Sequence, residues 1–421
     1  MKSVSIALVV HGWPAEKFGG VGLYVLALAK ELHRQHHDVT ILSPKQSTAY
    51  AICETPTEWG RHLSISIPLA KNWKETWSRD ANTLQTLLKP YRFDVVHIHH
   101  LGNWPLLLPK LISAPVRILT LHDYAIICIR GQLYHPQHGI CSGPAPEKCM
   151  ACIRSHLAHH PLFYRISKYT PARVTNRIKK WIAKLPTSSH QNWIQDRIQA
   201  SSDCLEGFDL ILSPSHDLIN RMSVFSASAI SYDPLPLLSP LERRGSLPST
   251  PYCFLFASSI IPTKGLHLVL DVMKHLPNAQ LLVAGSGFPF DGWPNYEKDQ
   301  IQRCHALPNV KYLGAIPHDQ MAEVLSQAHC LVLPSLWPEN SPIIVREALS
   351  LGLSVICSKE GGARELSHTI HTISPYDHHD LLITMKRLSH SPASKEIHHF
   401  LTIEEHVYAL SQRYLGNRFA N

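Results

Sequence analysis

The sequence predicts an α/β protein with two doubly wound, Rossmann-like domains, and three observations support this. The 421 residues are too many for one ordinary core and suit two domains. Short continuous apolar runs alternate with helical patterns, which is typical of parallel sheets covered by helices on both faces. A segment rich in Pro and Ser, residues 233–251, interrupts these runs, and they restart after it.

The interruption divides the chain into an N-terminal domain, 1–235, and a C-terminal domain, 251–402, although one large domain with a long insertion would also fit. We expect the strands at the continuous apolar runs 5–10, 39–42, 94–99, 116–122, 210–213, 252–257, 280–285, 330–335 and 354–358. Apolar residues at helical spacing predict helices at 21–35 and 321–328.

The composition is globular, with 44% hydrophobic and 17% charged residues. A net charge of +8 favours anionic partners, such as nucleotide diphosphates, acidic lipid surfaces or nucleic acid, without choosing among them. No apolar stretch approaches the roughly 20 residues needed to span a bilayer. The first apolar run is too short and too early for a signal peptide, so we expect a cytoplasmic protein that can rest on a membrane.

The segment 331–365 carries the richest pattern of polar residues. A strand ends at Pro334 and Ser335, and Ser341 is expected to cap a helix that has Pro342 at its first position. The amide-rich start of such a helix attracts a diphosphate. Glu339 precedes the helix and Glu347 lies inside it; carboxylates there can accept hydrogen bonds from sugar hydroxyls.

This segment resembles the Glu-x7-Glu signature of retaining GT-B glycosyltransferases of family 4. Glu339 and Glu347 have the required spacing, and a Gly-Gly-x-x-Glu motif follows at 361–365. The resemblance implies a GT-B fold, in which two Rossmann-like domains face a cleft. It also implies that Glu339 contacts the donor sugar, that Glu347 contacts the ribose, and that the diphosphate meets backbone amides near Ser341, Pro342 and Ile343.

A second element, 256–287, resembles the Pro-x-Lys-Gly loop of the same family, followed by a strand that ends in Gly-x-Gly. By this resemblance Lys264 neutralises the leaving diphosphate, and Gly285 belongs to the donor site. Many relatives have an arginine where this chain has Ser259, so one positive charge is missing here.

In the N-terminal half, Gly19 and Gly20 precede a helix and resemble the family's glycine loop, where backbone amides approach the donor. His122 and Asp123 follow a strand, as His-Asp commonly does in the family. The resemblance implies that His122 lies beside the transferred sugar. His99, after another strand, is a candidate for acceptor contact together with Asp123.

The resemblance implies retention by a front-face route in which the leaving phosphate helps to deprotonate the acceptor hydroxyl, because no carboxylate is an evident nucleophile. The sequence contains no Asp-x-Asp motif, so we expect catalysis without a divalent metal or other cofactor. The expected partners are a nucleotide-sugar donor and a glycan or lipid-linked acceptor, and no helix-turn-helix or zinc finger supports nucleic-acid binding. Two alternatives stay open: a nucleotide-sugar 2-epimerase, and an inactive sugar- or nucleotide-binding scaffold.

Two further features are not part of the donor motifs. Four cysteines cluster and could hold a structural zinc ion, with reduced thiols in a loop as the alternative: Cys128, Cys141, Cys149 and Cys152. Residues 165–184 contain seven basic residues, no acid and apolar residues at helical spacing. Such a helix can bind an anionic membrane or dock on the N-terminal domain. The final helical pattern, 402–415, is expected to return to the N-terminal domain, with 403–421 packing on it.

Overall fold

The structure is a computed structural model. It describes residues 3–13, 19–70, 74–75, 77–135, 139–157, 188–243, 251–288, 290, 293–391 and 396–416, with the backbone alone for 153–157 and 188–192. The chain divides into two compact units. Unit 1 comprises Met1–Gln132, Gln195–Pro240 and Phe400–Asn421, and unit 2 comprises Leu133–Ile194 and Leu241–His399. The basic segment 165–184 lies outside the described residues.

Unit 1 is built on an eight-stranded sheet in the order β10-β9-β6-β5-β1-β2-β4-β3. Its strand pairs are parallel except β3–β4, which is antiparallel. The strands are β1 Ser5–Val9, β2 Asp38–Ser47, β3 Ala51–Thr57, β4 Gly60–Pro68, β5 Val95–Ile98, β6 Val116–Thr120, β9 Leu210–Ser213 and β10 Ile230–Tyr232.

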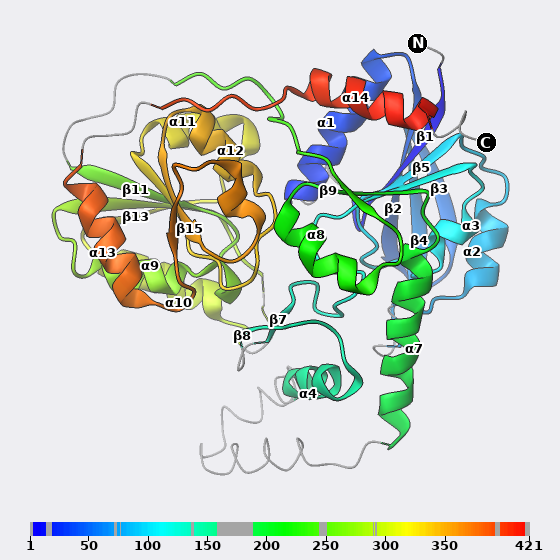
Figure 1. Cartoon of the computed structure of the whole chain (residues 1–421), viewed down its shortest axis with the longest axis horizontal. Helices are drawn as coiled ribbons and strands as arrows, with labels where there is room; N and C mark the ends of the chain where they lie inside the picture. The colour runs from blue at the N-terminus through cyan, green and yellow to red at the C-terminus, as the bar shows by residue number, and fades with distance from the viewer. Residues whose placement is uncertain are drawn as a thin grey trace. The chain divides into compact units, whose positions relative to one another are not determined.

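The helices of unit 1 include one from the end of the described chain. Helix α14, Ile403–Gly416, lies against α1, Gly20–Arg34 (Figure 1). Its Val407, Leu410 and Tyr414 are buried in the same apolar core as the central strands. The other helices of unit 1 are α2 Ala81–Leu88, α3 Leu108–Leu111, α8 His216–Met222 and η1 Ser223–Phe225; α7, Ser188–Leu205, begins in unit 2 and ends in unit 1.

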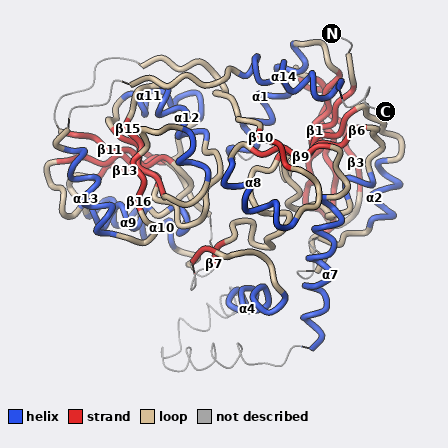
Figure 2. The backbone as a smooth tube through the Cα atoms, in the orientation of Figure 1, coloured by secondary structure: helices blue, strands red, loops and turns tan. Residues whose placement is uncertain are grey.

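Unit 2 is built on a six-stranded parallel sheet in the order β13-β12-β11-β14-β15-β16. Helices lie on both sides of this sheet (Figure 2). The strands are β11 Tyr252–Ala257, β12 Ala279–Ala284, β13 Val310–Gly314, β14 Cys330–Leu333, β15 Ser354–Ser358 and β16 His371–Ile373. A two-stranded hairpin, β7 Tyr134–His135 with β8 Gly139–Ile140, and helix α4 Pro146–Leu157 come first in the sequence of unit 2. The helices that follow are η2 Pro262–Lys264, α9 Leu266–Met273, α10 Tyr296–Ala306, η3 His318–Gln320, α11 Met321–Ser326, α12 Ile343–Ser350, η4 Gly362–Leu366 and α13 His378–Ser389.

The order of strands fixes where each unit can bind a ligand. Sheets of this type bind ligands beyond the carboxyl ends of the strands, at the point where the strand order reverses. In unit 2 that point lies between the neighbouring strands β11 and β14, and in unit 1 between β1 and β5. The loops that follow these four strands are therefore the first places to look for a site.

The predicted α/β fold with parallel sheets is confirmed, and the continuous apolar runs 252–257 and 354–358 coincide with β11 and β15. Strands β3 and β4 were not predicted. In β4 the buried residues Leu63, Ile65 and Ile67 alternate with serines, so the segment has no continuous apolar run. Among the described residues no helix is long and apolar enough to cross a membrane.

Candidate active site

The loops after β11 and β14 bring together two charged residues that the sequence singles out. Lys264 Nζ donates a hydrogen bond to Glu339 Oε1, and these side chains form an ion pair. Ser335 Oγ donates to the other carboxylate oxygen of Glu339 at 2.7 Å. The Lys264 ammonium also lies 5.3 Å from the ring centre of Trp337. Glu339 is only 8% exposed, so these partners offset the cost of burying its charge.

Backbone contacts hold the two loops together at the switch point. Leu336 N–H donates to the carbonyl oxygen of Thr263 at 2.8 Å. Gly265 adopts a left-handed conformation with φ 79°, and a Cβ there would lie 2.3 Å from the carbonyl oxygen of Pro334. Only glycine fits this approach, which places the neighbouring Lys264 next to the segment that carries Glu339.

Gly361 also allows two backbone segments to approach closely, here its own loop and the segment that carries Glu339. Its φ is 89°, and a Cβ would lie 2.2 Å from the carbonyl oxygen of Glu339. These two residues form a parallel bridge, and Ala363 N–H donates to Glu339 O at 3.3 Å. The first half of the Gly-Gly-x-x-Glu motif therefore has a structural role, because it sets the backbone of Glu339.

Glu347 is 3% exposed and pairs with a histidine that the sequence did not single out. His318 Nε2 lies 2.6 Å from Glu347 Oε1. The hydrogen bond and charge of Glu347 raise the pKa of His318 against the effect of burial. His318 therefore holds the carboxylate of Glu347 in place. No pattern in the sequence linked residue 318 to Glu347, which follows 29 positions later.

The start of α12 differs from the prediction. The helix begins at Ile343, Pro342 is its N-cap in an extended conformation, and the cap forms no side-chain hydrogen bond. The prediction that Ser341 caps the helix is wrong. Its hydroxyl and carbonyl oxygens instead accept from Arg346 Nη1, whose side chain folds back along the helix. Because Pro342 has no N–H, the amides of Ser341, Ile343 and Ile344 are the ones that can face an anion.

The buried Arg346, which is 1% exposed, adds a positive charge beside this helix start. Together, Lys264, the N-terminus of α12 and Arg346 supply positive potential to one edge of the sheet of unit 2. Glu339 and Glu347 supply acceptors for hydroxyl groups. Such a set can hold a molecule that carries both a diphosphate and sugars.

The glycines after β12 also allow close backbone approach. Gly285 has φ 140°, and a Cβ there would lie 2.0 Å from the carbonyl oxygen of Ser258. A Cβ on Gly287 would lie 2.3 Å from the carbonyl oxygen of Ile260. Ser259 is exposed between these contact points. The glycines thus explain the packing of two loops, and the donor contact predicted for Gly285 stays a prediction.

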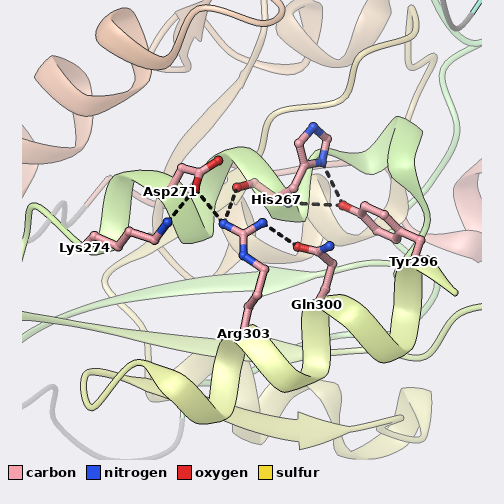
Figure 3. A network of polar contacts seen from close by, with 6 residues as sticks. All are labelled: His267, Asp271, Lys274, Tyr296, Gln300 and Arg303. Atoms are coloured by element: carbon pink, nitrogen blue, oxygen red, sulfur yellow. Dashed lines mark hydrogen bonds and ion pairs between the residues drawn. The ribbon is translucent and has the colours of Figure 1, made fainter. Parts of the chain in front are cut away.

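A polar network fixes the start of α9, directly after Lys264 (Figure 3). Tyr296 OH accepts a hydrogen bond from the backbone N–H of His267 at 3.1 Å. The same hydroxyl group lies 2.9 Å from Nδ1 of the His267 ring. Arg303 donates to Asp271 at 2.7 Å, and Lys274 donates to the same oxygen at 2.9 Å. Because burial and the Arg303 charge lower the pKa of His267 to about 4, its ring is neutral near pH 7. The network ties α10 to the helix that follows Lys264.

In unit 1, histidines gather at the carboxyl ends of β5 and β6. His99 Nδ1 lies 3.3 Å from His122 Nε2, so the two predicted residues are neighbours. Asp123 lies 2.9 Å from Nε2 of His100. Burial alone would lower the pKa of His100, but the charge and hydrogen bond of Asp123 outweigh it and raise this pKa. Gly19 is exposed at the start of α1, and a Cβ there would meet no atom within 4 Å.

His97 connects this cluster to the last helix. Its Nδ1 lies 2.7 Å from Tyr414 OH, and its Nε2 lies 2.7 Å from Thr120 Oγ1. A second link joins Tyr24 OH to His406 Nε2 at 2.8 Å. Burial, together with His122 and His406, holds the pKa of His97 well below its usual value. The ring is therefore neutral in the folded protein.

Acid is expected to destabilise unit 1 through His97. Unfolded histidine gains its proton near pH 6.5, whereas the buried ring of His97 stays neutral, so the free energy of unfolding is largest above that pH and decreases as the pH falls below it. Asp233 acts in the opposite direction, because burial raises its pKa to about 6. Melting temperatures at pH 7.5 and 5.5 should show a smaller difference in His97→Gln than in the wild type. The exposed control His33→Gln should keep the wild-type difference; an equal difference in all three proteins would contradict the assignment.

The cysteine cluster gives no metal site among the residues whose positions are described, where no three His, Cys, Asp or Glu side chains form a group that could hold an ion. Cys128 belongs to unit 1, whereas Cys141, Cys149 and Cys152 belong to unit 2. Gly143 N–H donates to the sulfur of Cys141 at 3.4 Å. The structural zinc ion stays a prediction.

Comparison with known families identifies both halves of the chain. The family model described as Glycosyltransferase Family 4 matches residues 18–221, and the model described as Glycosyl transferases group 1 matches residues 240–399. The chain is a GT-B glycosyltransferase of the family 4 type. The second match contains Lys264, Glu339 and Glu347.

Relatives agree with this assignment. A glycosyltransferase of Methanocaldococcus jannaschii is 22% identical over 383 residues, which cover 89% of this glycosyltransferase and 85% of the relative. The phosphatidylinositol N-acetylglucosaminyltransferase gpi3 subunit of Schizosaccharomyces pombe is 31% identical over 114 residues, 26% of this chain and 24% of the relative. The fold is shared with sucrose-phosphate synthase of Thermosynechococcus elongatus, with a TM-score of 0.67, 17% identity and 99% of each chain covered.

Proposed function

We propose that this glycosyltransferase moves a sugar from a nucleotide-diphosphate sugar to a hydroxyl group of a glycan or lipid-linked acceptor, with retention of the anomeric configuration. The observation that carries the proposal is the meeting of Lys264 and Glu339 at the switch point of unit 2, beside the start of α12. A nucleotide-sugar presents a diphosphate and hydroxyl groups, which match these charges and acceptors.

In the proposal, Lys264 and the first amides of α12 bind the diphosphate, Glu339 accepts hydrogen bonds from the transferred sugar, and Glu347 binds the ribose. The ion pair of the free protein then separates: the ammonium turns to phosphate and the carboxylate to sugar hydroxyls. The pair keeps both charges compensated until the donor arrives.

The reaction breaks the bond between the anomeric carbon and the phosphate oxygen and forms a bond from the acceptor oxygen to the same face of that carbon. The proton of the acceptor hydroxyl passes to the leaving diphosphate. Lys264, Arg346 and the start of α12 stabilise the charge that develops on the diphosphate. We propose that these groups carry the charge without a divalent metal; the absence of an Asp-x-Asp motif supports this.

His122, His99 and Asp123 belong to the acceptor side of the proposal, with His122 beside the transferred sugar and Gly19 and Gly20 near the donor phosphate. The lipid-linked option is supported by the similarity to the S. pombe transferase, whose name specifies phosphatidylinositol. We place the protein in the cytoplasm, where nucleotide-sugars are made, with a surface that can rest on an anionic membrane.

Incubation of the purified protein with labelled UDP- and GDP-sugars, with and without EDTA, tests this function. We expect slow donor hydrolysis without acceptor, transfer when an acceptor glycoside is added, a product of unchanged anomeric configuration by NMR, and no loss in EDTA. Interconversion of donors would instead indicate an epimerase, and binding without turnover would indicate a scaffold.

A further inference from the structure

Helix α7 contacts three consecutive backbone carbonyl groups of the loop that follows β6. Arg197 Nη1 donates a hydrogen bond to the carbonyl oxygen of Ile127 at 3.1 Å, and Arg197 Nη2 donates to that of Ala125 at 3.0 Å. The Ser201 hydroxyl group lies 2.8 Å from the carbonyl oxygen of Ile126 and 2.8 Å from that of Arg197, so it bridges the loop and its own helix. All of these residues belong to unit 1.

The loop is a compact turn that its own backbone hydrogen bonds close. Cys128 N–H donates to the carbonyl oxygen of Tyr124 at 2.7 Å, and Gly131 N–H donates to that of Cys128 at 2.9 Å. Tyr124 N–H in turn donates to the carbonyl oxygen of Gly131 at 3.2 Å. Carbonyl groups at the end of such a turn carry partial negative charge. The guanidinium group, with its fixed fork of N–H donors, can bind two of them at once.

The contact between helix and loop is buried. Arg197 is 7% exposed, and Ser201, Ile126 and Ile127 are buried with it. A hydrogen bond from a charged group is stronger in such surroundings than in water, and an arginine deprived of its acceptors there would be costly. The charge of Arg197 is therefore directed at the carbonyl groups of the loop and holds the loop against α7.

Ala125 connects this contact to a predicted site residue. Its carbonyl oxygen accepts from Arg197, whereas its N–H donates to Oδ1 of Asp123 at 2.8 Å. Oδ2 of Asp123 lies 2.9 Å from Nε2 of His100. Because Gly102 N–H donates to Nδ1 of His100 at 2.8 Å, the proton of the neutral ring is on Nε2, which donates to Asp123. The carboxylate is thus oriented from two sides.

Asp123 is held as a carboxylate. Burial alone would raise its pKa, but the charge and hydrogen bond of His100 and the N–H of Ala125 lower this pKa overall. The side chain of Asp123 is still 27% exposed, so its oxygens can accept a hydrogen bond from a hydroxyl group. A small displacement of a group that positions a reactant is enough to slow a reaction. The orientation of Asp123 therefore decides where a hydroxyl group can be held.

We propose that Arg197 is a positioning residue for the acceptor: by holding the loop after β6 it orients Asp123, which accepts a hydrogen bond from the acceptor hydroxyl group. This inference rests on the proposed function and adds to it a residue of α7, outside the motifs that the sequence predicted. Arg197 acts through Ala125 rather than on a substrate. Transfer to an acceptor therefore depends on Arg197, whereas donor binding and donor hydrolysis do not.

Two substitutions and a matched control test the proposal. Arg197→Met removes the guanidinium group and keeps an apolar side chain, whereas Arg197→Lys keeps the charge without the fork of donors. The control is Arg117→Met: this arginine also donates to a backbone carbonyl oxygen of unit 1, that of Pro109 at 2.9 Å, but lies at the opposite end of β6. Circular dichroism checks folding. If Arg197→Met does not fold, Ser201→Ala takes its place, because it removes the contact with Ile126 alone.

The orientation of Asp123 is measured first, without any substrate, by NMR on protein labelled at the histidine nitrogens. In the wild type, the Nε2 proton of His100 is hydrogen-bonded to a carboxylate and should give a downfield signal that exchanges slowly with water. His100→Gln assigns this signal. We expect the signal in Arg117→Met, a weaker one in Arg197→Lys or Ser201→Ala, and none in Arg197→Met. Equal signals in all folded variants, or no such signal in the wild type, would overturn the proposal.

Kinetics then distinguish a role in positioning from a role in folding. Donor hydrolysis and transfer to octyl glucoside are measured with the UDP- or GDP-sugar that the wild type uses. In Arg197→Met, kcat/KM for octyl glucoside should fall about tenfold or more, with partial recovery in Arg197→Lys. The KM for the donor and the rate of hydrolysis should stay within about twofold of the wild type.

The outcomes separate this inference from the proposed function. Equal losses of hydrolysis and transfer in Arg197→Met would show that Arg197 serves the fold alone, and wild-type transfer in this variant would refute its positioning role. A wild type that uses no donor would refute the proposed function. The NMR signal of His100 would still decide whether Arg197 orients Asp123, because it is recorded without substrate.

Discussion

Replacing Lys264 with alanine should lower the rate of sugar transfer by about 10²- to 10³-fold, the usual effect of removing one group that stabilises developing negative charge. The close approach of Gly265 to Pro334 holds Lys264 next to the segment that carries Glu339. The change also removes the partner of Glu339, which keeps only the hydrogen bond from Ser335.

Steady-state rates and melting temperatures must be measured together, because loss of a buried ion pair also lowers stability. Lys274→Ala is the matched control: this lysine also pairs with an acid, Asp271, but it is exposed and lies at the C-terminal end of α9. Lys264→Ala combined with Glu339→Gln removes the uncompensated charge. If this double variant regained wild-type turnover, Lys264 would be a structural residue.

Glu347→Gln should raise the KM for the donor by about 10- to 100-fold, with a smaller change in kcat. A hydrogen bond to a charged group contributes about 1.5–3 kcal/mol, and the ribose is bound equally in the ground and transition states. The substitution also returns the pKa of His318 towards its usual value, since Glu347 is the main cause of the raised pKa.

Donor titrations at constant acceptor concentration measure this effect, with the exposed Glu323→Gln of α11 as the control. A variant with wild-type KM and a lower melting temperature would show that the Glu347–His318 pair serves the fold alone.

The sequence predicted the central architecture because buried parallel strands are continuous apolar runs, as in β11 and β15. It did not predict β3 and β4, where alternation and an exposed edge replace such runs. On both strands polar side chains interrupt the apolar pattern, so no continuous apolar run marks them.

In the site of unit 2, too, the sequence predicted some residues and missed others. Glu339 and Lys264 were found because each follows a strand in a recognisable motif, and neighbouring strands bring them together. His318, Ser335 and Arg346 were missed because their roles depend on side-chain contacts across the fold or back along a helix. The prediction that Ser341 caps α12 was wrong because Arg346, five residues later, donates a hydrogen bond to the Ser341 hydroxyl group.

A crystal structure of the protein with bound UDP or GDP, whichever a thermal-shift panel with ADP shows to bind, tests the central claim most directly. We expect the diphosphate within hydrogen-bond distance of Lys264 Nζ and of the first amides of α12, the ribose hydroxyl groups on Glu347, and Glu339 separated from Lys264. A nucleotide bound elsewhere, with the Lys264–Glu339 pair intact and Glu347 turned to His318 alone, would contradict the account.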